Sequence, residues 1–442
     1  MSGPQTPTVP TSPEFQQFKA SLHRAVLDRL NLESLNRLGR DTAVQGVRSL
    51  ITDLMDHEIT PLSTAERRLI ADEIVNEIFG LGPLEPLLAD PTINDILVNS
   101  HAQVFVERNG RLERSGVTFK DDNHLMQIID RMVSQVGRRI DESSPMVDAR
   151  LHDGSRINAI IPPLAIDGPH LSIRKFRKDA LSGEDLLRLG TLVEPMLQLL
   201  TSCVKARLSI LISGGTGAGK TTLLNIFSSF IPSTERIVTI EDSAELRLHQ
   251  AHVVRLETRP ANIEGEGQIT QRQLVINSLR MRPDRIVVGE VRAGEAVDML
   301  QAMNTGHDGS LTTIHANAPR EALSRLETMV AMSGLQLPPR AVKEQIATAI
   351  NVVVQVARLA DGVRRVTTIS EIIGMEEDII TMQDIFTFEK LGISEDGKVV
   401  GRFRSTGIRP KFADRLRLSG IVLPAEMFDD TPDPEVVRRG WR

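Results

Sequence analysis

The sequence predicts an α/β protein whose main domain holds a mostly parallel sheet, preceded by an α+β domain and a small helical bundle. Three observations lead to this prediction. Buried-strand patterns alternate with helical patterns after residue 183, short strands with turn signals fill 91–161, and three amphipathic patterns come first. The predicted division is a disordered leader at 1–13, a bundle at 14–80, an α+β domain at 81–180 and the main domain at 181–442.

The bundle prediction rests on apolar residues that recur three and four positions apart. A first helix begins at Phe15 and a second covers 42–55. A third begins at Ser63, where Ser63 and Glu66 have the spacing of a capping box, and it ends near Gly80.

The α+β domain is predicted from short alternating patterns around one helical pattern. Asn109-Gly110 is a strong hairpin turn signal between two of the strands. The predicted strands cover 93–99, 103–107, 111–114, 146–151 and 156–161, and the predicted helix covers 123–137.

In the main domain, the sequence pattern predicts buried strands at 208–213, 236–240, 285–289, 310–314 and 351–359. Strands that alternate with helices indicate a parallel sheet covered on both faces. Ligands of such sheets bind at the carboxyl ends of the strands. Polar residues that follow these strands are therefore the candidate functional residues.

Composition excludes several classes of protein. The net charge of −6, the absence of Tyr and an aromatic fraction of 3% argue against a nucleic-acid binder. The single cysteine, Cys203, excludes an internal disulfide framework and a cysteine-rich metal site. The first residues lack the regions of a signal peptide, and no run reaches the roughly 18 apolar residues of a membrane span. We expect a soluble cytoplasmic protein.

The strongest motif fits G-x-x-x-x-G-K-[ST] and stands between a predicted strand and a helical pattern. Such a loop turns its backbone N–H groups toward phosphates, and the helix N-terminus adds a positive end. Lys220 is predicted to reach the β- and γ-phosphates of ATP, and Thr221 to bind Mg²⁺. The predicted nucleotide-binding residues are Gly214, Gly215, Thr216, Gly217, Ala218, Gly219, Lys220, Thr221 and Thr222.

Two further strands end in acids. Glu290 follows the strand at 285–289, which we expect to neighbour the P-loop strand and to bring the carboxylate close to Mg²⁺. Glu241 follows the strand at 236–240 and is predicted to orient or deprotonate the attacking water. Asp242 or Ser243 has the alternative role of a helix N-cap.

A histidine and two arginines complete the candidates. His315 ends the strand at 310–314, where a contact with the γ-phosphate is feasible, and the pattern includes no zinc-binding constellation. Arg174 opens a cluster of basic residues, and with Arg156 it is predicted to bring positive charge to the nucleotide when the α+β domain folds over it. The alternative for these arginines is a solvated charged surface.

Four motifs in this order resemble the secretion ATPase superfamily, which powers type II and type IV secretion and type IV pili. Residues 214–221 resemble its Walker A motif and residues 240–246 its Asp box. Residues 282–292 resemble its Walker B motif and residues 306–317 its His box. Residues 82–88, 258–265 and 299–310 look like the CpaF-type branch, the Tad pilus ATPases, and the resemblance covers roughly 60–442. Ala293 stands where many relatives have Gly.

The resemblance implies a homohexameric motor that hydrolyses ATP with Mg²⁺ and has a RecA-like main domain. It would work at the cytoplasmic face of the inner membrane, bound through pilus platform proteins, with a linker near 179–184 that lets its domains close and part. By their positions in the motifs, the resemblance implies that Lys220 binds phosphate and that Thr221 and Glu290 bind Mg²⁺. It also implies catalytic roles for Glu241, Glu290, His315, Arg174 and Arg156. Pilus extension and retraction both stay open.

Three alternatives remain beside the Tad reading. A type II or type IV secretion ATPase for protein export is the nearest, although the segments 82–88 and 258–265 favour the Tad branch. A nucleic-acid translocase would need a basic channel and usually stacking groups, against which the charge and composition argue. A scaffold without catalysis is disfavoured by the intact Lys220, Glu241 and Glu290.

Overall fold

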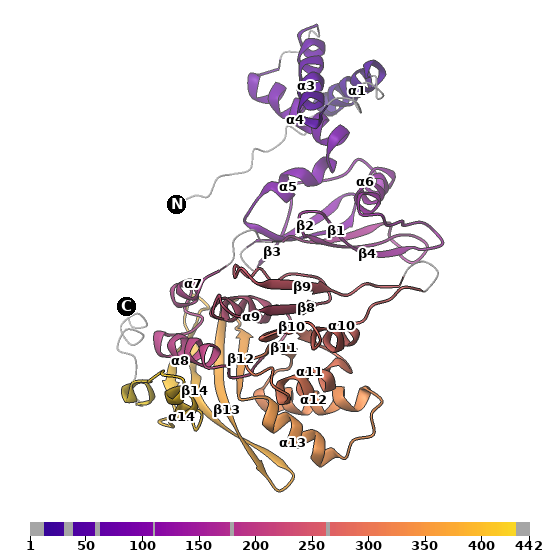
Figure 1. The fold of residues 1–442 in the computed structure, drawn as a ribbon. Helices are drawn as coiled ribbons and strands as arrows, with labels where there is room; N and C mark the ends of the chain where they lie inside the picture. The colour runs from indigo at the N-terminus through magenta and orange to yellow at the C-terminus, as the bar shows by residue number, and fades with distance from the viewer. Residues whose placement is uncertain are drawn as a thin grey trace. The chain divides into compact units, whose positions relative to one another are not determined.

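The computed structural model describes residues 13–30, 39–57, 62–108, 111–176, 181–261 and 266–429. Figure 1 traces the chain, which divides into a first compact unit, Met1–Arg177, and a second, Lys178–Arg442. The predicted leader lies outside the described residues except for Pro13, where the first helix begins. Part of the predicted linker, 179–180, also lies outside them.

The first unit begins with three packed helices, α1 (Pro13–Arg29), α3 (Arg40–Asp56) and α4 (Thr64–Phe79). Apolar residues at helical spacing bury a small core between them, including Leu22, Val26, Val47, Ile51, Ile70 and Ile74. The predicted capping box is confirmed, because Ser63 accepts from the Glu66 amide and the Glu66 side chain accepts from the Ser63 amide. The helix ends at the predicted place, with Gly80 as its C-cap.

The rest of the first unit is a six-stranded antiparallel sheet in the order β3-β2-β1-β6-β5-β4. The central strand β6 was not predicted from the sequence. The predicted turn at 109–110 lies outside the described residues, but Arg108 and Arg111 pair across β2 and β3, as a hairpin requires. The elements are η1 (Gly82–Leu84), α5 (Glu85–Ala89), β1 (Ile93–Ser100), β2 (Gln103–Arg108), β3 (Arg111–Arg114), α6 (Asp122–Gln135), β4 (Met146–Arg150), β5 (Arg156–Ile160) and β6 (His170–Arg174).

The second unit is built on a nine-stranded sheet in the order β15-β14-β13-β12-β7-β11-β10-β8-β9. The six strands from β12 to β9 are parallel, which confirms the predicted parallel sheet. Its strands are β7 (Ile210–Gly214), β8 (Ile237–Glu241), β9 (Val253–Glu257), β10 (Arg285–Val291), β11 (Leu311–His315), β12 (Val352–Arg358), β13 (Arg364–Glu376), β14 (Ile379–Ile393) and β15 (Val399–Ser405).

Helices cover both faces of this sheet (Figure 1). Ile210 and Ile212 of β7 belong to one buried cluster and Leu211 to the other, as the alternation of side chains along a strand requires. The helices are α7 (Gly183–Arg188), α8 (Glu194–Lys205), α9 (Lys220–Ser229), α10 (Gln271–Ser278), α11 (Glu295–Asn304), α12 (Pro319–Met332), α13 (Pro339–Ala349), α14 (Ala413–Leu418) and η2 (Ala425–Phe428).

Three antiparallel strands, β13 to β15, extend the parallel sheet beyond β12. These strands were not predicted, because they contain no continuous apolar run: buried residues are interspersed with exposed or half-buried residues, many of them polar. The sequence nevertheless carried two signals for them. Asp361-Gly362 stands between β12 and β13 and Asp396-Gly397 between β14 and β15, and Asp-Gly is a typical hairpin turn pair.

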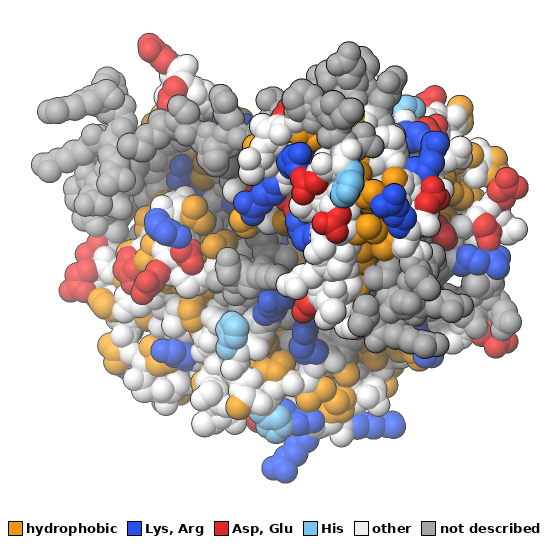
Figure 2. Space-filling model, turned by 90° about the horizontal axis from the view of Figure 1, so that it is seen from above, with side chains coloured by type: hydrophobic (Ala, Val, Ile, Leu, Met, Phe, Trp, Pro, Cys, Tyr) orange, Lys and Arg blue, Asp and Glu red, His pale blue; other side chains and the backbone are white. Residues whose placement is uncertain are grey.

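The face of the protein in Figure 2 is mixed in charge. Basic and acidic side chains lie interspersed over the face in Figure 2 rather than in one large basic area. Among the residues that the structure describes, no helix has both the length and the apolar character that crossing a membrane requires.

Candidate functional site

The G-x-x-x-x-G-K-[ST] segment forms a loop between β7 and α9. Gly219 is the N-cap of α9 and has a φ of 101°, a left-handed conformation that favours glycine. The Lys220 ammonium donates to the Gly215 carbonyl at 3.1 Å. Thr221 and Thr222 lie in the first turn of α9, as the motif predicts. Arg364 of β13, which sequence reasoning missed, donates from Nε to the Gly217 carbonyl at 3.0 Å.

Gly214, the last residue of β7, has no room for a side chain. An added Cβ would lie 2.5 Å from the Val356 carbonyl of the neighbouring strand β12. We expect Gly214→Ala to lower the free energy of unfolding by about 1–3 kcal/mol, because the backbone of two strands must shift. Thermal unfolding measures this effect. Gly215→Ala is the matched control, since its nearest neighbour would be Asn317 Oδ1 at 3.9 Å. Equal melting temperatures for both variants would contradict the expectation.

The candidate acids and His315 lie at the carboxyl ends of their strands, which is the edge of the sheet where the P-loop lies. Glu241 is the last residue of β8, His315 is the last residue of β11, and Glu290 lies one position before the end of β10. The predicted neighbourhood of β10 and the P-loop strand is wrong, because the sheet order is β7-β11-β10-β8 and β11 separates them. The separating strand brings His315 into register with Gly214.

Glu241 is buried, and its two carboxylate oxygens differ. Oε1 accepts from the backbone amides of Glu245 and Leu246 at 2.8 and 3.0 Å. Oε2 is buried and has no hydrogen-bond partner. Burial raises the pKa of Glu241, and the two amides oppose that shift. The side chain is therefore held in place by one oxygen, while the other remains able to accept a proton.

Glu290 lies between two cations. Its Oε1 is 3.8 Å from the Lys220 ammonium, and its Oε2 accepts from Arg292 Nε and Nη2 at 2.8 and 2.7 Å. Burial lowers the pKa of Lys220, and the attraction of Glu290 opposes this. Glu290 thus links the P-loop lysine to the end of β10.

Asp242 does not act as a helix N-cap, which corrects one alternative for this residue. No helix occurs in the fully described stretch 242–252. The Asp242 carboxylate instead accepts from Arg292 Nη1 at 2.8 Å, so that Arg292 joins the ends of β8 and β10. Ser243, the other proposed cap, likewise precedes no helix there.

The donor set of this edge fits Mg²⁺ that arrives with a nucleotide. Among the described residues, no group of three or more His, Cys, Asp or Glu side chains could hold a metal ion. Mg²⁺ is commonly bound by one or two carboxylates together with substrate phosphates, and so it does not need such a group. The predicted ligands, the Thr221 hydroxyl and the Glu290 carboxylate, are oxygen donors of the kind that Mg²⁺ takes.

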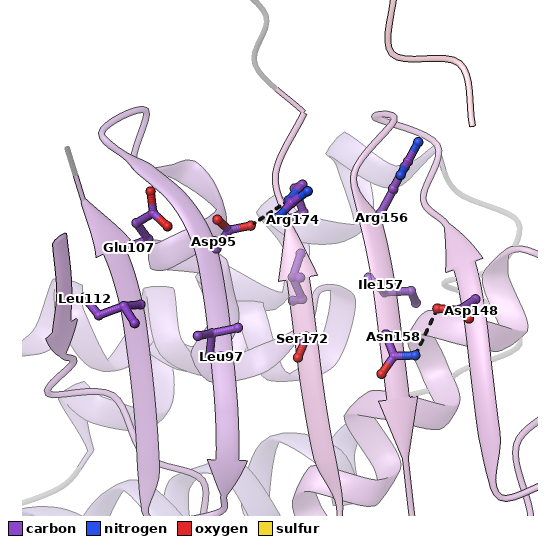
Figure 3. A pocket seen from close by; sticks show the side chains of 11 residues that line it. Asp95, Leu97, Glu107, Leu112, Asp148, Arg156, Ile157, Asn158, Ser172 and Arg174 are labelled. Atoms are coloured by element: carbon purple, nitrogen blue, oxygen red, sulfur yellow. Dashed lines mark hydrogen bonds and ion pairs between the residues drawn. The ribbon is translucent and has the colours of Figure 1, made fainter. Parts of the chain in front are cut away.

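Arg156 and Arg174 lie together on the sheet of the first unit. They face each other across β5 and β6 and line one end of a hollow of about 430 Å³ (Figure 3). Arg174 donates from Nε to Asp95 Oδ1 at 3.1 Å, and its side chain is 65% exposed. The structure places the two arginines side by side as a pair. Their approach to the nucleotide stays a prediction.

A Gly-rich loop between a central parallel strand and a helix, with acids at the ends of further parallel strands, defines a P-loop domain of the RecA-like class. The comparison with protein families is more specific. The family described as Type II/IV secretion system protein matches residues 77–395, so the chain belongs to this family.

Two relatives in sequence agree with this assignment, and one solved structure is reported beside them. A putative conjugal transfer protein of Mycobacterium tuberculosis is 42% identical over 300 residues, which cover 66% of this chain and 85% of that protein. The type IV secretion system protein VirB11 of Brucella suis is 33% identical over 305 residues, covering 63% and 84%. The crystal structure of the Brucella suis VirB11 ATPase in complex with sulphate aligns with 30% identity and a TM-score of 0.35, covering 65% of this chain and 94% of that one.

Proposed function

We propose that this protein is an Mg²⁺-dependent ATPase that converts hydrolysis into mechanical work. The observation that carries the proposal is the edge of the nine-stranded sheet, where Lys220, Glu241 and Glu290 come together on the P-loop and two strand ends. The sequence similarity to VirB11 of Brucella suis, which is known as an ATPase, supports the same activity.

In this proposal each residue has one task. Lys220 binds the β- and γ-phosphates, and Thr221 and Glu290 hold the Mg²⁺ that neutralises phosphate charge. Glu241 accepts the proton of the attacking water through its unpartnered Oε2. The water oxygen then bonds to the γ-phosphorus while the bond to the bridging oxygen of ADP breaks. His315 contacts the γ-phosphate, and Arg156 and Arg174 add positive charge from the first unit.

The finer proposal is that six copies form a ring that drives the Tad type IV pilus at the cytoplasmic face of the inner membrane. It rests on the segments 82–88, 258–265 and 299–310, of which 262–265 lie outside the described residues. In this proposal the ring is attached through pilus platform proteins. Closure of the two units on ATP and their release after hydrolysis supply the movement.

A second candidate is a motor for type IV secretion or conjugal transfer. The observation in its favour is the 42% identity to a protein named for conjugal transfer. Deleting the gene separates the two candidates. Loss of surface pili with unchanged protein export and conjugation supports the Tad motor, and the reverse pattern supports the secretion or transfer motor.

The ATPase proposal predicts a severe effect of Lys220→Ala. Loss of the ammonium removes the charge that stabilises the transferring phosphoryl group, so we expect turnover to fall by about 100-fold or more. Phosphate release from Mg-ATP by the purified full-length protein measures this. Lys411→Ala serves as a control, because the exposed Lys411 precedes the short helix α14 and makes hydrogen bonds with Glu371 and Asp414 through its backbone. Turnover at the wild-type rate in Lys220→Ala would contradict the proposal.

A further inference from the structure

Arg292 joins two of the acids at the candidate site, and no other residue does so in the part of the chain that the structure describes. Its guanidinium contacts Glu290 Oε2 through Nε and Nη2 at 2.8 and 2.7 Å. The same group reaches Asp242 Oδ2 through Nη1 at 2.8 Å. The planar fork of arginine suits this arrangement, since three of its donors serve two carboxylates at once.

The two acids lie at the carboxyl ends of neighbouring strands. β8 and β10 are parallel partners, with Ile240 opposite Val288, and Asp242 and Glu290 follow at their carboxyl ends. Two carboxylates that both contact one guanidinium are close enough to repel each other unless a cation lies between them. Arg292 supplies that cation, and it links the Asp box segment to the Walker B segment across 50 residues of sequence.

The backbone of Arg292 is itself fixed. Glu295, a buried residue in the first turn of α11, accepts from the Arg292 and Ala293 amides at 2.6 and 2.9 Å. Gly294 packs so closely on Ser333 that an added Cβ would lie 2.9 Å from its Cα. Although the Arg292 side chain is 58% exposed, it therefore begins from a rigid loop, unlike a typical surface ion pair.

We propose that Arg292 is a positioning residue for ATP hydrolysis, which orients the Glu290 carboxylate toward Mg-ATP and uses Asp242 as its second anchor. The inference rests on the proposed ATPase function. In this structure Glu290 is held from two sides, by Lys220 and by Arg292. Once Lys220 turns to the phosphates, Arg292 is the cation that still holds Glu290 in place.

The test uses the full-length protein and the variants Arg292→Gln, Arg292→Lys, Asp242→Asn and the double variant Arg292→Gln/Asp242→Asn. Loss of an outer partner of a metal ligand commonly lowers metal affinity or activity by about 10- to 100-fold. We expect Arg292→Gln to lower kcat within that range and to raise the Mg²⁺ concentration for half-maximal turnover. The KM for ATP and the melting temperature should stay near the wild-type values.

The other variants distinguish positioning from a loss of folding. Asp242→Asn should lower kcat by less than Arg292→Gln, and the double variant should be no slower than Arg292→Gln alone, because both changes break one linkage. Arg292→Lys should recover part of the rate, since it keeps the charge. Arg402→Gln, which removes a comparable pair with Glu389 at 2.7 Å on β15, should leave turnover unchanged.

Two results would overturn the inference. One is an Arg292→Gln variant with wild-type kcat and Mg²⁺ dependence, measured beside an active wild type. The other is an Arg292→Gln variant whose lower kcat is matched by a lower melting temperature, together with a double variant in which the losses of kcat from Arg292→Gln and Asp242→Asn multiply. A wild-type protein without ATP turnover would instead contradict the proposed function, and the inference with it.

Discussion

Glu241→Gln is expected to abolish most ATP turnover while nucleotide binding survives. Glutamine can keep the two bonds from the Glu245 and Leu246 amides, but it cannot take a proton from water. Removing a general base commonly lowers the rate by about 100- to 10,000-fold. Phosphate release and the binding of a fluorescent ATP analogue, measured on the same sample, separate these two effects. Turnover above about a tenth of the wild-type rate would assign the base to another group.

The same variant has a stability signature that does not depend on activity. Because burial raises the pKa of Glu241 in the folded protein, ionising it destabilises the fold. The raised pKa of Glu241 contributes stability to the folded protein that is fully present below the ordinary glutamate pKa. This stability is lost as the pH rises through the raised pKa of the folded protein. Glu241→Gln should therefore melt above the wild type at neutral and alkaline pH, and the difference should shrink toward pH 4.5. A variant that melts lower at every pH would contradict the burial argument.

Arg285→Met is expected to lower the free energy of unfolding of the second unit by about 3–5 kcal/mol. The Arg285 side chain is fully buried at the amino end of β10 and pairs with Glu235 at 2.5 Å. It also donates to the Gly309 and Val204 carbonyls at 2.9 and 2.8 Å. Removing it leaves the Glu235 carboxylate buried, with the longer contact to Arg207, at 3.4 Å, as its one remaining ion pair among the described residues. Denaturant unfolding followed by far-UV circular dichroism measures the loss.

The double variant Arg285→Met/Glu235→Met tests the reason for that loss. If the cost comes from the unpaired carboxylate, removing both charges should restore much of the stability, because apolar replacement of a buried pair is commonly near neutral. The pair lies at the opposite end of β10 from Glu290 and does not take part in the site. ATP turnover in both variants should therefore fall only as far as the fraction of folded protein falls. A double variant less stable than Arg285→Met alone would point to lost packing instead.

The sequence predicted five of the six parallel strands because their signal is strong, and it missed the half-exposed edge strand β9. Runs such as 208–213 and 285–289 are mostly apolar, as is typical of strands buried on both faces, and β7 and β10 lie there within two residues. β6 and β13 to β15 carry many polar residues on one face, and their apolar content alone did not distinguish them from loops. The turn signals at 361–362 and 396–397 would have revealed two of the missed hairpins.

The candidate site was predictable only in part. Motif spacing identified the loop, Glu241, Glu290 and His315, because the ends of parallel strands meet at one edge of a sheet. It did not give the strand order, and so it placed Glu290 one strand too close to the P-loop. Contacts such as Arg292 with Asp242 and Arg364 with Gly217 join residues that are 50 and 147 positions apart, and no local pattern marks them.

ATP turnover by the purified full-length protein tests the central claim most directly. The rate of phosphate release is measured with Mg²⁺, with a chelator in place of Mg²⁺, and with added single- and double-stranded DNA. The account predicts steady turnover that needs Mg²⁺ and does not respond to DNA. Turnover that appears only with DNA would indicate a nucleic-acid translocase, and phosphate release that persists in the chelator would contradict the Mg-ATP site at Lys220, Thr221 and Glu290.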